Sequence, residues 1–343
     1  MKWPPSRGYQ NQDIQGNSYL NRSISFSTSQ VAKIIFCFIC TGMFLSGDSD
    51  RLKKTVVSAS PQQLSHKITQ VAADISVRVL NQDFLGSGFI VQRTNDEYFV
   101  ITNQHVLRAG EAPYRVETND GNTYLAEVVG EMAVLKDQYD LAILKFKADT
   151  EYQTATLGNS LRLEVGESVF AAGFPAQDNG FPQTSSIFAQ SHPSSTRKLS
   201  LKSGRVAIIL NQALAEGYQI GYTNDVKKGM SGGPLFNAQG EVIGVNGKHA
   251  YPLWESPEIY QDGSEPCPAL QDLITRLSLA IPIEKTINLT TQFNPLKSPI
   301  ELEDPTPNAN LSAAESQLIA KMRVEAEKTQ LECRKEDNPT LRF

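Results

Sequence analysis

Short strand-like segments separated by turn residues fill the middle of this 343-residue chain, and they constrain its fold more than any other feature. Residues 75–80 alternate apolar and polar side chains, as a half-buried strand does. Residues 116–129 hold two such segments around an Asn-Asp-Gly-Asn turn, which predicts a hairpin. Similar segments follow at 86–91, 98–102, 141–146, 168–175, 201–210, 218–223 and 241–247. This spacing predicts an all-β fold, a barrel or a sandwich.

One glycine-rich turn carries a candidate nucleophile. The segment GMSGGPL at 229–235 places Ser231 among glycines, which leave its hydroxyl uncovered and free nearby N–H groups to face a substrate carbonyl. Alone, the string would suit a flexible turn equally well. Upstream, however, TNQHV contains His105 and DLAIL begins at Asp140. The order His, Asp, Ser along the chain is one of three found in unrelated serine proteases.

These segments carry a family resemblance. ITNQHVL, DLAIL and GMSGGPLFNAQGEVIGVN resemble the catalytic segments of trypsin-like (chymotrypsin-fold) serine endopeptidases, in the bacterial form related to HtrA-like and glutamyl-endopeptidase-like proteases. The similarity runs from about residue 75 to 287, with 35 residues from His105 to Asp140 and 91 from Asp140 to Ser231. It implies two six-stranded antiparallel β-barrels, here with a C-terminal helical extension, and hydrolysis of peptide bonds through an acyl-enzyme intermediate.

The resemblance and the composition together divide the chain. We expect a leader at 1–47, a polar connector at 48–70, a protease domain at 71–290 with barrel 1 at about 71–155 and barrel 2 at about 156–290, and a linker with a helix at 291–343. Helical patterns are predicted at 269–279 and 313–335. HtrA-type proteins carry a PDZ module after the protease, and we expect none here because nothing after Pro295 is long enough.

By this resemblance, Ser231 is the nucleophile, His105 the general base and Asp140 the residue that orients the imidazole. The backbone N–H groups of Gly229 and Ser231 would form the oxyanion hole. Asp137 lies three residues before Asp140, but only Asp140 directly precedes the Leu-Ala-Ile-Leu strand. A hydrophobic residue, Met230, stands where digestive relatives carry an aspartate, so activation by a salt bridge to a new N-terminus is not expected.

Substrate contacts are also implied by the family. The strand at 241–247 would run beside bound peptide, so Val245 and Asn246 are candidate substrate-binding residues. Asp225 lies six residues before Ser231, the position that gives trypsin its preference for Arg and Lys. The alternative is an ordinary Thr-x-Asp turn, which relatives with other specificities carry here. Both interpretations of Asp225 stay open.

Charge and motif content exclude several other classes. A net charge of −5, from 32 basic and 37 acidic side chains, gives no general attraction to nucleic acid. No His, Cys or carboxylate cluster has metal-ligand spacing, so no metal is expected. Gly86-Ser87-Gly88 lacks the lysine of a phosphate-binding loop, and no cofactor is predicted. A polypeptide substrate is the expected partner.

An apolar run of twelve residues, 34–45, follows Lys33. Its length fits the core of a signal peptide better than a membrane span, which needs about 20 residues. We therefore expect an exported protein of the periplasm, thylakoid lumen or extracellular space. The second half looks most like cyanobacterial members, which points to the periplasm or thylakoid lumen. With no clean cleavage site after the run, residues 34–45 could instead anchor the protein at a membrane.

The four cysteines separate into two pairs. Cys37 and Cys40 lie inside the apolar run, where redox or metal chemistry is not expected. Cys267 and Cys333 would remain in a mature chain. In an exported protein they could form a disulfide, worth about 4 kcal/mol at best by the chain-entropy estimate. Two separate thiols are the alternative.

Two rival functions belong to other classes. The first is a chaperone-like or peptide-binding protein of low activity on the same fold. The second is a membrane-anchored adaptor in which the helix at 313–335 recruits a partner.

Overall fold

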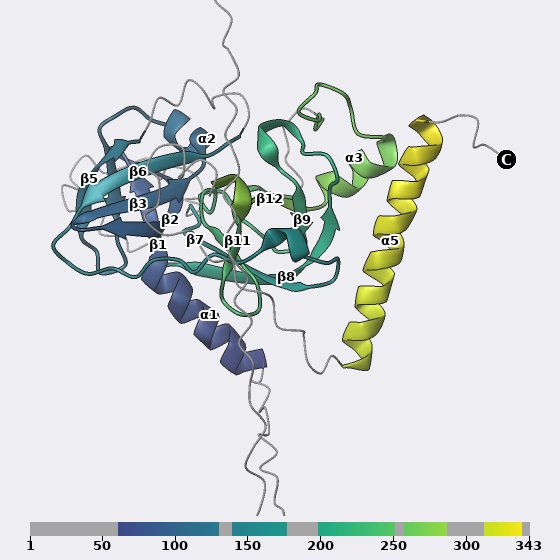
Figure 1. Cartoon of the computed structure of the whole chain (residues 1–343), viewed down its shortest axis with the longest axis horizontal. Coiled ribbons are helices and arrows are strands. Elements are labelled where there is room, and N and C mark those ends of the chain that lie inside the picture. Colours follow the sequence, from purple (N-terminus) through teal and green to yellow (C-terminus); the bar gives the residue numbers. More distant parts are fainter. Residues whose placement is uncertain (1–60, 130–138, 177–197, 251–256, 287–311, 338–343) are drawn as a thin grey trace, which may run out of the picture. The chain divides into compact units, whose positions relative to one another are not determined.

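The computed structural model describes residues 61–129, 139–176, 198–250, 257–286 and 312–337 (Figure 1). They all belong to one compact unit, residues 56–343. Several sequence predictions therefore fall outside the described residues: the leader with its apolar run, most of the polar connector, Asp137, and the linker before the C-terminal helix.

Six antiparallel strands close the first barrel in the order β1-β2-β3-β6-β5-β4. Apolar side chains point inward from every strand, and the rings of Tyr98 and Phe146 stack with centroids 5.3 Å apart. The strands are β1 (Ser76–Leu80), β2 (Phe84–Thr94), β3 (Glu97–Thr102), β4 (Tyr114–Glu117), β5 (Thr123–Val128) and β6 (Ala142–Lys147).

The second barrel closes in the order β10-β11-β12-β9-β8-β7. Its strands are β7 (Ser168–Gly173), β8 (Ser200–Ile209), β9 (Ile220–Tyr222), β10 (Pro234–Phe236), β11 (Val242–Lys248) and β12 (Ser278–Pro282). Two closed six-stranded antiparallel barrels confirm the predicted all-β, chymotrypsin-like fold. The single-turn 3-10 helix η1 (Ser160–Arg162) precedes β7, and a second one, η2 (Ala215–Gly217), lies between β8 and β9.

The helix predicted over 269–279 is only partly correct. Helix α3 (Pro268–Thr275) ends earlier, and residues 278–282 form β12, which pairs with β11 on one side and β9 on the other. Every residue of β12 is buried. A short apolar run cannot be assigned to helix or strand by periodicity alone, and here the two neighbouring strands decide.

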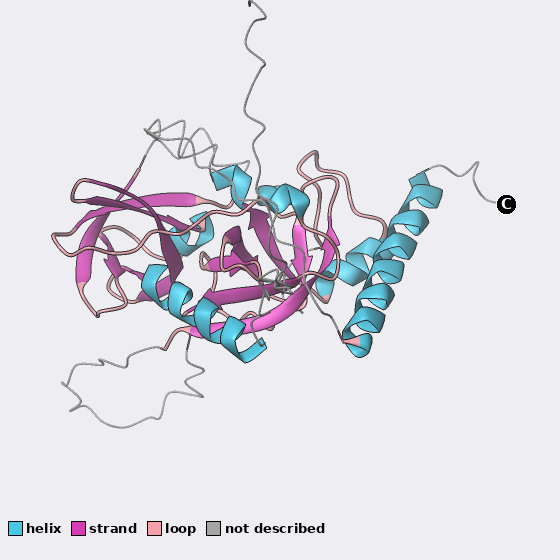
Figure 2. Cartoon of the chain, turned by 60° about the horizontal axis from the view of Figure 1, so that its bottom comes forward, coloured by secondary structure: helices cyan, strands magenta, loops and turns pink. Residues whose placement is uncertain are grey.

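Helix α1 (Pro61–Ile75) begins inside the stretch predicted to be a polar connector. Ile68, Ala72 and Ile75 recur at helical spacing and are buried in a core cluster that contains residues of both barrels. The helix itself contacts β2 and lies against the strands (Figure 2). The polar residues around them concealed this apolar stripe. Residues 61–70 of the expected connector are therefore helical.

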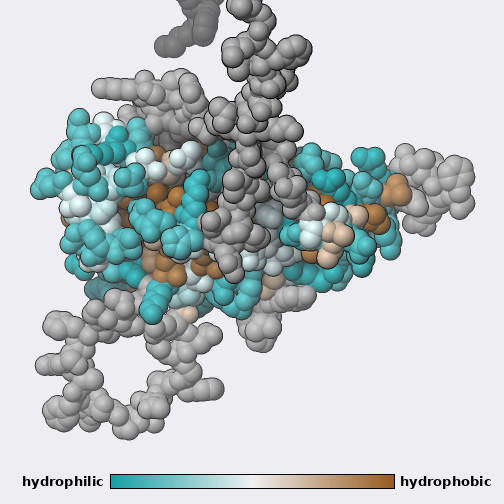
Figure 3. All heavy atoms as spheres, turned by 90° about the horizontal axis from the view of Figure 1, so that it is seen from below, coloured by the Kyte–Doolittle hydropathy of each residue, from teal (hydrophilic) through white to brown (hydrophobic). Residues whose placement is uncertain are grey.

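Helix α5 (Ala313–Asp337) confirms the predicted C-terminal helix and lies beside α3 (Figures 1 and 2). A disulfide joins Cys267 to Cys333, which decides between the pair and two free thiols. Ion pairs tie the helix to barrel 2, including Arg205 to Glu315 at 3.0 Å. Ala326 is buried, whereas three apolar side chains of α5 are exposed: Leu318, Val324 and Leu331. Figure 3 shows hydrophobic atoms among hydrophilic ones at the edge of the molecule formed by α5.

Candidate active site

Strand pairing brings the predicted base and its orienting carboxylate together. β3 and β6 are antiparallel neighbours, with Thr102 opposite Ala142. His105 lies just after the end of β3, on the short helix α2 (Gln104–Arg108), and Asp140 lies just before the start of β6. The histidine therefore sits on a helix rather than at the strand end itself. Two residues 35 apart in sequence become neighbours because the ladder aligns the ends of their strands.

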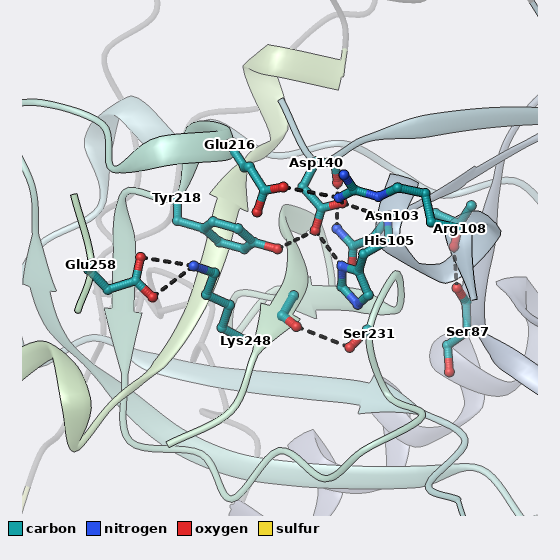
Figure 4. A network of polar contacts seen from close by, with 12 residues as sticks. Ser87, Asn103, His105, Arg108, Asp140, Glu216, Tyr218, Ser231, Lys248 and Glu258 are labelled. Carbon is teal, nitrogen blue, oxygen red and sulfur yellow. Dashed lines mark hydrogen bonds and ion pairs between the residues drawn. The ribbon is translucent and has the colours of Figure 1, made fainter. Parts of the chain in front are cut away.

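The Asp140 carboxylate makes two hydrogen bonds to His105 (Figure 4). Oδ2 lies 2.5 Å from Nδ1 of the imidazole, and Oδ1 accepts the backbone N–H of His105 at 2.8 Å. Asp140 is 1% exposed, whereas the His105 side chain is 39% exposed. This pair of contacts fixes the ring, and it leaves Nε2 directed away from the aspartate.

The pKa of the Asp140 carboxyl lies below its ordinary value of 3.8. Burial by itself would raise it, but the hydrogen bond and charge of His105 and the hydrogen bond from Tyr218 outweigh the burial. Asp140 is therefore ionised throughout the neutral pH range. A buried carboxylate that stays charged is suited to stabilise an imidazolium.

Ser231 lies on the side of the imidazole opposite Asp140 (Figure 4). Its hydroxyl donates to the carbonyl of Gly247 at 3.0 Å. Gly229 and Gly232 flank it at φ +92° and +84°, which glycine adopts without strain, and a Cβ at Gly232 would come within 2.1 Å of the Ser87 carbonyl oxygen. His105, Asp140 and Ser231 thus form one cluster.

The predicted oxyanion hole has a fixed peptide plane. The Lys228 carbonyl accepts the N–H of Ala176 at 2.7 Å. Because the Lys228–Gly229 peptide bond is trans, the N–H of Gly229 points in the direction opposite to the Lys228 carbonyl. In the described part of the chain, the N–H groups of Gly229 and Ser231 donate to no protein acceptor. Both are thus available to a substrate oxygen.

Ser87, a buried residue to which the sequence suggested no catalytic role, hydrogen-bonds to the turn that carries the predicted nucleophile Ser231. The Ser87 hydroxyl on β2 donates to the Gly229 carbonyl at 2.7 Å and accepts the Phe174 N–H at 2.8 Å. Its backbone N–H donates to the Ser231 carbonyl at 2.9 Å. Ser87, which belongs to barrel 1, therefore fixes the turn of barrel 2 that contains Gly229 and Ser231. The only sequence signal was the Gly86-Ser87-Gly88 string.

Replacing Ser87 with alanine is expected to lower the free energy of unfolding by about 1–3 kcal/mol, because two buried backbone groups lose their partner. The loosened Gly229 peptide should also reduce kcat by about tenfold to a hundredfold. Thermal unfolding and kinetics on a peptide substrate would measure both. Ser76→Ala is the matched control, since Ser76 is also buried and its hydroxyl has no partner in the described ranges. Equal effects of the two substitutions would contradict this role of Ser87.

The three predicted substrate-binding residues, Asp225, Val245 and Asn246, are either exposed to solvent or buried against other parts of the protein. The Asp225 side chain is 66% exposed and pairs with Lys227 at 2.7 Å, so it does not lie at the base of a buried pocket. Val245 is fully buried, and β11 is paired on both sides there, with Pro234 and Ile281. The Asn246 amide is likewise buried and bonded to protein carbonyls and to Tyr222.

Met230 is fully buried and packs in the core of barrel 2. Among the described residues, no group of three or more His, Cys, Asp or Glu side chains is arranged to hold a metal ion. No helix in the described ranges is long and apolar enough to cross a membrane.

Two β-barrels, with a serine on a glycine turn beside a histidine that a buried aspartate orients, define the serine-protease class of chymotrypsin-like folds. Comparison with known proteins agrees. Residues 86–245 match the family model of the trypsin-like peptidase domain, and this part of the chain is such a domain.

Curated relatives are similar over the same region. The chain is 36% identical over 165 residues to a probable periplasmic serine endoprotease DegP-like from Halomonas elongata, covering 47% of this chain and 29% of that protein. It is 32% identical to the serine proteases Do-like HtrA of Lactobacillus helveticus and Bacillus subtilis, over 161 and 162 residues, covering 47% of this chain and 35% and 32% of theirs. The chain thus spans about a third of the length of the relatives it matches.

Proposed function

We propose that this protein is a serine endopeptidase that hydrolyses polypeptides through an acyl-enzyme intermediate. The observation that carries the proposal is the arrangement around His105. A buried, ionised Asp140 binds Nδ1 of its ring, and Ser231 lies on the opposite side (Figure 4).

In the proposed reaction the Ser231 hydroxyl turns from the Gly247 carbonyl toward the imidazole and attacks the scissile carbonyl carbon, while its proton passes to Nε2 of His105. The N–H groups of Gly229 and Ser231 bind the oxygen that becomes negative. The C–N bond then breaks, and the leaving amine takes the proton from His105. Water, deprotonated by the same nitrogen, attacks the ester and releases the acid and Ser231.

The substrate strand would bind along β11 just beyond Asn246. Up to that residue, the β10 side of β11 is occupied: Gly233 accepts the Asn246 N–H at 2.9 Å, and the Asn246 carbonyl accepts the Gly232 N–H at 2.8 Å. Gly247 and Lys248 follow, and on the β10 side the described residues offer them no strand partner. An extended peptide can add its backbone there, next to Ser231.

We also propose that the protein is exported. The support is the signal-like run at 34–45, the Cys267–Cys333 disulfide, and relatives described as periplasmic.

A fluorophosphonate probe tests the proposed function. An activated serine attacks its phosphorus, an Oγ–P bond forms and fluoride leaves. The full-length chain should be labelled on the peptide that contains Ser231, as found by mass spectrometry, and it should cleave unfolded casein. If the folded protein is labelled nowhere and casein stays intact, the endopeptidase proposal fails. The bond from Ser231 to Gly247 would then describe an unreactive site, and the peptide-binding alternative would take its place.

A further inference from the structure

The Asp140 carboxylate has a third hydrogen bond, from a second side chain, besides its two contacts with His105. The hydroxyl of Tyr218 donates to Oδ2 at 2.5 Å, the same oxygen that binds the imidazole (Figure 4). Tyr218 is fully buried and lies between η2 and β9 in barrel 2, whereas Asp140 belongs to barrel 1. The aspartate is thus held from both barrels.

We propose that Tyr218 is a positioning residue for catalysis: its hydroxyl fixes the Asp140 carboxylate and takes part of its charge, and so tunes how strongly the aspartate binds His105. This inference rests on the proposed function. Tyr218 itself touches neither His105 nor Ser231 in the described contacts, so it acts only through Asp140.

Gly247 lies next to the Tyr218 hydroxyl and, having no side chain, leaves room for the contact with Asp140. A Cβ built on Gly247 would lie 2.1 Å from the hydroxyl oxygen and 2.4 Å from the ring carbon Cε1. Any side chain at 247 would therefore displace the tyrosine. Gly247 also supplies the carbonyl that accepts the Ser231 hydroxyl, so one residue accommodates the tyrosine and contacts the nucleophile.

Charged groups lie beside both the Tyr218 ring and the Asp140 carboxylate. The Lys248 ammonium lies 5.0 Å from the centre of the Tyr218 ring and is itself held by Glu258 at 2.7 and 2.8 Å. On the other side, Arg108 lies 3.8 Å from Asp140 and 3.0 Å from the Glu216 carboxylate. Lys248 thus contacts the tyrosine ring, and Arg108 contacts the carboxylate that the tyrosine hydroxyl binds.

The backbone around Tyr218 reinforces the same contact. The Glu216 carbonyl, two residues before Tyr218, accepts the backbone N–H of Asp140 at 2.8 Å. Glu216 adopts φ +62°, which is unusual for a residue with a side chain. The turn is therefore held in a costly conformation that places both the carbonyl and the tyrosine against Asp140.

Tyr218 stays protonated, so it is a permanent donor. Its burial, followed by the charge of Asp140 and the hydrogen bond to it, raises the pKa of the hydroxyl well above 10.0. A neutral donor stabilises the ionised carboxylate and withdraws charge from the oxygen that faces His105. Without it, Asp140 would attract the protonated imidazole more strongly.

Tyr218→Phe in the full-length chain tests the proposal, because it removes only the hydroxyl. We expect kcat to fall about threefold to thirtyfold with KM unchanged, because the carboxylate that orients His105 is no longer fixed. The stronger attraction of Asp140 for the protonated imidazole should raise the midpoint of the acid limb of the pH–rate profile by about half a pH unit. The low-field NMR resonance of the proton between His105 and Asp140 should move further downfield, and this measurement needs no activity.

Tyr222→Phe is the matched control. Tyr222 is also a fully buried tyrosine of barrel 2, but its hydroxyl donates to Asn246 at 2.8 Å. It should lower thermal stability without moving the His105 resonance. The inference is overturned if Tyr218→Phe leaves the resonance in place or moves it upfield, or if Tyr222→Phe moves it equally. Failure of the proposed function shows itself separately, as an unmodified protein that the fluorophosphonate does not label.

Discussion

Ser231→Ala is expected to lower kcat for peptide cleavage by about a millionfold and to abolish fluorophosphonate labelling. The alanine keeps the φ angles of the glycine turn and removes only the hydroxyl that bonds to Gly247. In the proposed reaction this hydroxyl forms the acyl-enzyme, so its loss removes that route. Stopped assays at high enzyme concentration would measure the residual rate.

The control for this experiment is Ser76→Ala, which removes another buried serine hydroxyl, one that has no hydrogen-bond partner within the described ranges. It should leave labelling and turnover near those of the unmodified protein. If Ser231→Ala is still labelled, or retains more than about a thousandth of the activity, another residue must be the nucleophile.

Asp140→Asn is expected to lower kcat by about ten thousandfold while the fold is kept. The amide is nearly isosteric, but its NH₂ group would donate toward the Nδ1 atom of His105 and favour the tautomer whose Nε2 carries the proton. That tautomer cannot accept the Ser231 proton. Kinetics across pH 5–9, with circular dichroism to verify folding, would show the loss. A loss of less than tenfold would contradict the assigned role of Asp140.

Asp140→Asn should also change how the free energy of unfolding depends on pH. The pKa of Asp140 is lowered on folding from 3.8, so its ionisation stabilises the native state above that pH, and this stabilisation is lost as pH falls through the folded-state pKa. The difference in unfolding free energy between the unmodified protein and Asp140→Asn should therefore shrink below about pH 4. Urea unfolding at pH 7 and pH 3 would measure it. A difference that stays constant would contradict the lowered pKa.

Sequence reasoning could single out the proposed triad because each member lies in a short local string whose chemistry can be interpreted: His105 after a strand, Asp140 before one, Ser231 between glycines. The structure brings the three together. Sequence reasoning did not reveal Tyr218 or Ser87, because their roles arise from contacts between the barrels. Tyr218 and Asp140 are 78 residues apart in the chain, and Ser87 and Gly229 are 142 apart. A tyrosine before a strand is ordinary until its neighbour is known.

The errors in the fold have the same physical origin. Periodicity assigned residues 278–279 to a helix, but pairing with β9 and β11 makes them a strand. The position of Asp225 suggested a pocket, but whether that carboxylate faces a cavity or solvent depends on how the turn is oriented, and it is exposed beside Lys227. Local strings thus predict chemistry and element type, whereas side-chain environment depends on tertiary contacts.

The disulfide between Cys267 and Cys333 has a consequence for the integrity of the chain. A single backbone cut anywhere between residues 287 and 311 would not release α5, because the helix would still be bonded through sulfur to the residue preceding α3. The nicked molecule would migrate as one species under non-reducing conditions and as two after reduction. Detachment of the C-terminal helix therefore requires both a protease and a reductant, and neither alone is sufficient.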